Sequence, residues 1–135
     1  MLLQERHIYH IYNRGNNSQK IFFTHENYRC FLEKLRKYLT LHCDILARTL
    51  MPSHFHLLVC ANPNSAKIVG NHTISRCTFN EGLRGLLNSY TQAINKQEAR
   101  AGSLFIQNTK FKCLSDSKDK NLTVSPVFIT SIRTP

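Results

Sequence analysis

Residues 50–59 read Leu50-Met51-Pro52-Ser53-His54-Phe55-His56-Leu57-Leu58-Val59, a run that turns at Pro52 and then continues as a strand. Proline cannot donate to a strand ladder, so Pro52 belongs at a strand end. Side chains alternate between the two faces of a strand, so His54 and His56 share one face and Phe55 lies on the other. Two imidazoles on one face can bind a divalent metal, although histidines on a half-exposed strand would give the same pattern.

The segments around this run alternate between strand and helix patterns. Aromatic and β-branched residues predict strands, and apolar residues at helical spacing predict helices, the first begun by an N-cap at Thr24. The expected strands are 7–13, 43–50, 54–60 and 103–114, and the expected helices are 25–41 and 78–98. The order strand, helix, strand, strand, helix, strand predicts an α+β, ferredoxin-like (split βαβ) sandwich, an antiparallel sheet with two helices on one face.

Three segments have a weaker pattern. Arg14-Gly15-Asn16-Asn17-Ser18-Gln19 predicts a turn or loop, since Gly and Asn tolerate positive φ. Its Arg and amide side chains suit phosphates or bases, but a plain hairpin turn would look the same. Residues 66–77 have no clear period and are expected to form a surface loop, and 115–135 contain no amphipathic helix.

Composition limits the possible partners. The chain has 135 residues, which suits one compact domain, and a net charge of +10, which favours a polyanion, with nucleic acid first. No apolar run approaches the length of a membrane span, and the N-terminus does not have the pattern of a signal peptide. The five cysteines are scattered without a Cys-x-x-Cys pair, so reduced thiols in a cytoplasm are expected.

Four groups of residues resemble one protein family, the single-tyrosine transposases with a His-hydrophobic-His (HUH) motif, including the REP-associated tyrosine transposases of bacterial chromosomes. The order and spacing of these groups match the family through about residue 114. The groups are 9–15 with 21–23; 50–59; 87–91 with Asn95; and 102–105 with 110–112.

The resemblance implies a ferredoxin-like core, a homodimer, and binding of single-stranded DNA with hairpins in the bacterial cytoplasm, at the nucleoid. It implies that His54 and His56, with a third polar ligand, hold Mg²⁺ or Mn²⁺ and that no small-molecule cofactor is used. Imidazole suits Mn²⁺ better than the harder Mg²⁺. The candidate DNA-binding residues are Asn13, Arg14, Asn16, Asn17, Lys110 and Lys112.

The family's nucleophile is a tyrosine on a helix after the fourth strand, in a pattern like Tyr-Ile-His-x-Asn-Pro, which forms a 5′-phosphotyrosine link. This chain has neither that pattern nor a tyrosine after Tyr90. Tyr90 is the remaining candidate, but it lies within an apolar helical stripe from Leu83 to Ile94 and so is also expected in the core or cleft. Residues 1–114 are therefore expected to form the transposase-like domain, and 115–135 a tail in place of the catalytic helix.

A shift of reading frame would explain the missing pattern. The genetic code permits ATT ACA TCC ATC AGA ACC CCN for Ile129-Thr130-Ser131-Ile132-Arg133-Thr134-Pro135. Read from the third nucleotide, the same bases encode Tyr-Ile-His-Gln-Asn-Pro. Residues after about Asp119 are therefore expected to be a shifted reading of the family's catalytic helix, and poorly ordered.

Three functions stay open at this point. The first is a transposase-type DNA nuclease and strand transferase, with cleavage impaired in this copy. The second is a DNA-binding remnant or repurposed module that cannot cut. The third is an RNA-recognition-type domain, which needs stacking aromatics on the central strands; Tyr9 and Tyr12 give it slight support, while His54 and His56 argue against it.

Overall fold

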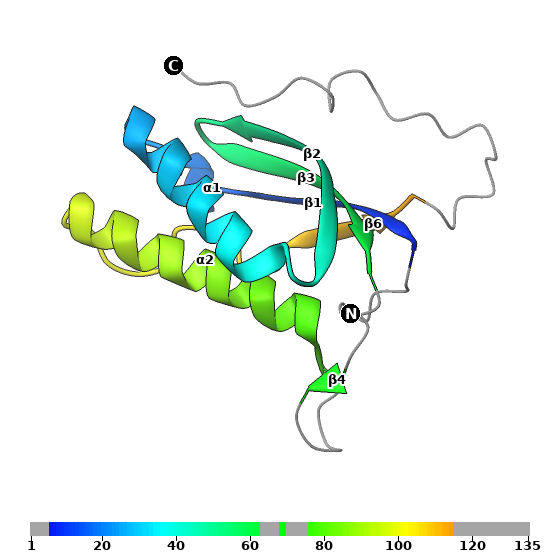
Figure 1. The fold of residues 1–135 in the computed structure, drawn as a ribbon. Coiled ribbons are helices and arrows are strands. Elements are labelled where there is room, and N and C mark those ends of the chain that lie inside the picture. The colour runs from blue at the N-terminus through cyan, green and yellow to red at the C-terminus, as the bar shows by residue number, and fades with distance from the viewer. Residues whose placement is uncertain (1–5, 63–67, 70–75, 115–135) are drawn as a thin grey trace.

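The structure is a computed structural model that describes residues 6–62, 68–69 and 76–114 (Figure 1). The predicted tail at 115–135, including the segment with the shifted-frame match, lies outside the described residues. The domain boundary at residue 114 therefore stays a prediction.

The elements follow the predicted order. The main sheet is formed by β1 (Ile8–Arg14), β2 (Cys43–Met51), β3 (His54–Ala61) and β6 (Lys110–Cys113), and the helices are α1 (His25–Leu39) and α2 (Thr78–Gln97). Asn27 Oδ1 accepts from the backbone N–H groups of Phe23 and Thr24, which fixes the start of α1 at the predicted cap. In the described part of the chain, neither helix combines the length and the apolar character needed to span a membrane.

The main sheet has the strand order β2-β3-β1-β6, and each neighbouring pair is antiparallel. Both helices pack on the same face of this sheet, as Figure 1 shows. The predicted α+β architecture, a four-stranded antiparallel sheet with two helices on one face, is confirmed. The strand that carries the two histidines, β3, is one of the two central strands.

Two predicted segments differ from the structure. Only Lys110–Cys113 of the expected strand 103–114 is a strand, because the preceding residues follow α2 as a loop that bends to meet Gly15, where Phe105 forms an isolated bridge. Within 66–77, expected to be a loop, β4 (Ile68–Val69) pairs with β5 (Arg76–Cys77), as the β-branched residues of the first strand favour. The rest of that segment lies outside the described residues.

The core occupies the space between the sheet and the helices. Alternate residues of the central strands, such as Ile11, Phe55 and Leu57, are fully buried there against Phe31 of α1 and Tyr90 of α2. Burial of each such side chain contributes about 1.5–3 kcal/mol. The intervening residues must then point to the other side of the sheet, the helix-free face, defined here by His10, Tyr12, Arg14, His54, His56, Lys110 and Lys112.

Candidate metal and nucleic-acid site

His54 and His56 lie together on the helix-free face, as the alternation of the strand predicts. Their ring centroids are 5.2 Å apart and the rings are nearly perpendicular, at 88°. His54 pairs across the sheet with Arg14, and His56 pairs with Tyr12. The two imidazoles are therefore held by the register of two central strands and not by a loop.

The start of β3 is fixed by the segment that follows β1. The Gly15 N–H donates to Ser53 O at 2.9 Å, and the N–H groups of Ile21 and Phe22 both donate to Pro52 O, at 2.7 and 3.1 Å. A Cβ at Gly15 would lie 2.0 Å from Gln19 O, so only glycine fits there. These contacts set the position of His54 immediately after the turn.

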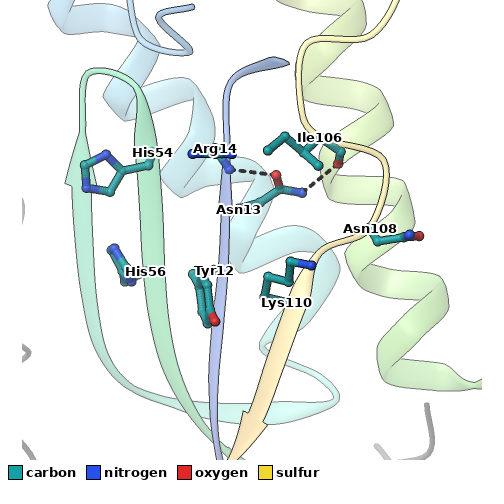
Figure 2. A pocket seen from close by; sticks show the side chains of 8 residues that line it. All are labelled: Tyr12, Asn13, Arg14, His54, His56, Ile106, Asn108 and Lys110. Carbon is teal, nitrogen blue, oxygen red and sulfur yellow. Dashed lines mark hydrogen bonds between the residues drawn. The ribbon is translucent and has the colours of Figure 1, made fainter. Parts of the chain in front are cut away.

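A pocket of about 390 Å³ opens beside the histidine pair (Figure 2). Figure 2 shows Tyr12 between His56 and Lys110, which agrees with the pairing of Tyr12 with both residues across the sheet. The described residues that line the pocket include two cations and two imidazoles but no carboxylate; they are Tyr12, Asn13, Arg14, His54, His56, Ile106, Asn108 and Lys110. Such a lining suits an anion such as a phosphate.

The predicted DNA-binding residues separate into different environments. Arg14 and Lys110 are exposed and line the pocket, and Lys112 lies further along the same face, paired with His10. Asn16 and Asn17 are exposed in a short 3₁₀ turn, Asn16–Ser18, where Asn17 has a φ of 57°, as the predicted loop allows. Contact between these residues and DNA stays a prediction.

Asn13 differs from the other predicted DNA-binding residues because it is buried. Its Nδ2 donates to Ile106 O at 3.1 Å and to Thr109 Oγ1 at 2.9 Å, and its Oδ1 accepts from the Arg14 N–H at 2.6 Å. Figure 2 shows the bonds to Ile106 and Arg14. In this structure Asn13 anchors the loop that forms one wall of the pocket.

His10 is a site residue that the sequence interpretation missed. Its Nε2 lies 2.8 Å from His56 Nδ1, and its ring is 4.5 Å from that of Tyr12. Burial, followed by the charges of His56 and Lys112, lowers the pKa of His10 to about 4. Burial and His54 also lower the pKa of His56, so both rings are neutral near pH 7. The sequence does contain a pattern that indicates this position, because His10 and Tyr12 are two residues apart on β1, as His54 and His56 are on β3.

Tyr90 lies in the core. It is fully buried, its hydroxyl donates to Ile21 O at 2.6 Å, and its ring packs edge-on against Phe31. Burial raises its pKa well above the ordinary range for tyrosine. These contacts are those of a core residue and not of a nucleophile. Tyr9 is also buried, so it cannot serve as a stacking aromatic of an RNA-recognition-type surface. Tyr12, the other tyrosine that favoured such a surface, lies on the helix-free face.

We expect Tyr90→Phe to lower the free energy of unfolding by about 1–3 kcal/mol, because the variant leaves the buried Ile21 carbonyl without its donor. Urea denaturation would measure the change. Tyr38→Phe is the matched control, since Tyr38 is only partly buried and should change stability little. Equal stability of Tyr90→Phe and the native chain would show that the hydroxyl has no structural role.

The residues present fit a divalent metal as a two-histidine site. His56 Nδ1 contacts His10, and His54 Nδ1 lies 3.4 Å from Ser53 Oγ, so each ring would bind a metal through Nε2. Within 6–62, 68–69 and 76–114, no group of three His, Cys, Asp or Glu side chains could hold a metal ion. Among the described residues, the other ligands available to such an ion are amides, and water or phosphate oxygens would complete the set; such oxygen ligands suit Mn²⁺ and Mg²⁺.

Two solved structures, both described as transposases, have folds similar to that of this chain. A REP-associated tyrosine transposase solved bound to a REP hairpin superposes with a TM-score of 0.59 at 13% identity, over 88% of this chain. A putative transposase from Deinococcus radiodurans R1 superposes with a TM-score of 0.53 at 17% identity, over 84% of this chain and 82% of its own.

This chain covers 62% of the REP-associated protein, less than two thirds of its length. No protein-family model and no curated protein sequence matches the chain. At these identities the likeness establishes the fold, and that fold is the one expected from the sequence resemblance.

Proposed function

We propose that this chain is a transposition-related protein of the single-tyrosine HUH class, which binds structured single-stranded DNA on its helix-free face. The observation that carries the proposal is the pocket, which joins the histidine pair to two cationic side chains, Arg14 and Lys110, on a transposase fold. A backbone phosphate in this pocket would lie among the imidazoles, the guanidinium and the ammonium group.

His54 and His56 would hold Mn²⁺ or Mg²⁺ in this pocket. When bound, the metal would polarise the phosphoryl oxygens of a DNA strand. The chain itself would orient the metal ligands and neutralise the charge of the DNA backbone. β1 and β3 fix the two imidazoles, while Arg14 and Lys110 offset phosphate charge.

Cleavage by this copy is proposed to be impaired. The chain has five tyrosines, and all lie within the described residues; Tyr9, Tyr28 and Tyr90 are buried in the core, and Tyr38 packs against α2 at Gly85. Tyr12 alone among them lines the pocket. The function supported best is therefore metal and DNA binding without efficient formation of a phosphotyrosine link. This proposal includes the alternative of a DNA-binding remnant or repurposed module, because such a module would bind DNA in the same way without cutting it.

An RNA-recognition-type domain is the second candidate. The observation in its favour is that His10 and Tyr12 lie on a central strand of the helix-free face, where stacked bases are bound in such domains. Competition between DNA and RNA oligonucleotides of the same sequence separates the two functions, since tighter binding of unstructured RNA would favour this candidate.

Homodimerisation and a location at the nucleoid in the bacterial cytoplasm complete the proposal. Light scattering coupled to gel filtration measures the oligomeric state, and imaging of a fluorescent fusion shows the location in the cell. A monomer at all accessible concentrations, or a fusion spread evenly through the cell, would contradict the respective part.

We expect the chain to bind hairpin-flanked single-stranded DNA with an affinity that falls steeply as salt rises. Each phosphate neutralised contributes roughly −0.7 to the log–log slope for a single strand. Lys110→Gln/Lys112→Gln should weaken binding and flatten the slope by roughly 1.4, as expected if both residues contact phosphates. Fluorescence anisotropy over a salt series measures both quantities.

The matched control is Arg36→Gln/Lys37→Gln, which removes the same charge from exposed positions on α1, on the opposite face. Its affinity should stay near that of the native chain. Equal losses in the two double variants would mean that net charge alone drives binding and would contradict the assignment of the helix-free face.

A further inference from the structure

His10 and His56 form a pair of coupled imidazoles beside the pocket. They come from neighbouring strands, and His10 Nε2 lies 2.8 Å from His56 Nδ1. Their rings are stacked, with centroids 5.1 Å apart and planes at 24°, and the Tyr12 ring packs against both, at 4.5 and 5.6 Å. The position of each ring is therefore set by a hydrogen bond and by packing.

The hydrogen bond has two possible directions, with different chemical consequences. A neutral imidazole has one N–H donor and one acceptor nitrogen. If His10 donates, His56 carries its own proton on Nε2, and that nitrogen has no lone pair for a metal. If His56 donates through Nδ1–H, its Nε2 presents a lone pair, and His10 carries its proton on Nδ1.

We propose that His10 is a positioning residue for the metal ligand His56: its Nε2 accepts the His56 Nδ1–H and so sets the tautomer and ring orientation with which Nε2 of His56 binds a metal. This inference rests on the proposed function, which makes His56 a ligand. Partners that orient a ligating histidine typically change metal affinity by about 10–100-fold when they are removed. His10 acts through His56 and supplies no bond to the metal.

The packing of Tyr12 indicates which variants test this role. His10→Phe keeps an aromatic ring against Tyr12 but removes the acceptor. His10→Gln replaces the ring with an amide whose oxygen can accept from His56 Nδ1–H. His25→Gln is the control, because His25 is exposed at the start of α1, away from the pocket.

The primary experiment needs no metal. Long-range ¹H–¹⁵N spectra of the histidine rings, recorded at a pH where the rings are neutral, report which nitrogen of each ring carries the proton. We expect His56 to be protonated at Nδ1 and His10 at Nδ1 in the native chain. A spectrum with His56 protonated at Nε2 would overturn the proposal.

The second experiment measures Mn²⁺ affinity by electron paramagnetic resonance. We expect about a tenfold or greater loss in His10→Phe, partial recovery in His10→Gln and no change in His25→Gln. Unchanged affinity in His10→Phe would also overturn the proposal. If the native chain bound no Mn²⁺ at all, the proposed metal function would fail, while the metal-free spectra would still decide the direction of the His10–His56 bond.

Discussion

Replacing His54 and His56 together by alanine should reduce Mn²⁺ binding to the level of a protein that has no metal site. The two rings share one face of β3, and in the described part of the chain no group of three His, Cys, Asp or Glu side chains could hold a metal ion. Loss of both imidazoles would leave only weak ligands, such as the Asn108 amide, in the pocket. Electron paramagnetic resonance of free Mn²⁺ measures the binding directly.

The matched control is His7→Ala/His25→Ala, which removes the same number of imidazoles from positions outside the pocket. This variant should bind Mn²⁺ as the native chain does. Thermal unfolding followed by circular dichroism should show that both double variants keep the fold, because neither pair belongs to the buried core. Equal Mn²⁺ binding by the native chain and by the His54/His56 variant would refute the metal site.

The second large effect concerns covalent chemistry. The chain as it stands should form no 5′-phosphotyrosine adduct with a hairpin substrate, because four of its five tyrosines lie away from the pocket and the ring of the fifth, Tyr12, packs against His10 and His56. A chain translated in the frame that encodes Tyr-Ile-His-Gln-Asn-Pro should form the adduct, since covalent attack needs a tyrosine that can reach the scissile phosphate. Denaturing gels with labelled DNA, followed by mass spectrometry of the adduct, measure the link.

Two outcomes would change this interpretation. An adduct formed by the present chain and abolished by Tyr12→Phe would make Tyr12, the tyrosine in the pocket, the nucleophile. An adduct abolished by Tyr90→Phe would require Tyr90 to leave the core contacts described above. The control for the restored frame is the same chain with phenylalanine in place of its new tyrosine, which should form no adduct.

Much of the architecture could be predicted because it depends on local patterns. The alternation around Phe55 placed both histidines on one face, and the helical spacing of apolar residues located α1 and α2 to within about two residues. The succession of elements predicted the split βαβ architecture, one antiparallel sheet with two helices on one face.

The remaining features depend on contacts between residues far apart in sequence. Asn13 was predicted to bind DNA, which stays a prediction, but its bonds to Ile106 and Thr109, partners more than 90 positions away, could not be predicted from the sequence. The loop before β6 was predicted as strand because its composition is β-biased, whereas its path is set by Gly15 and Phe105. The His10–His56 bond could not be predicted without the register between β1 and β3, although the alternation of His10 with Tyr12 was visible.

The central claim is that one pocket on the helix-free face binds both the metal and the DNA. Paramagnetic broadening by Mn²⁺ in ¹H–¹⁵N spectra of the native chain tests it most directly, since broadening depends on distance from the ion. Signals of β1 and β3 around Tyr12, His54 and His56 should broaden first, and signals of α1 should not; added hairpin DNA should perturb the same strands. Broadening centred instead on the exposed carboxylates of α1, Glu26 and Glu33, would contradict the account.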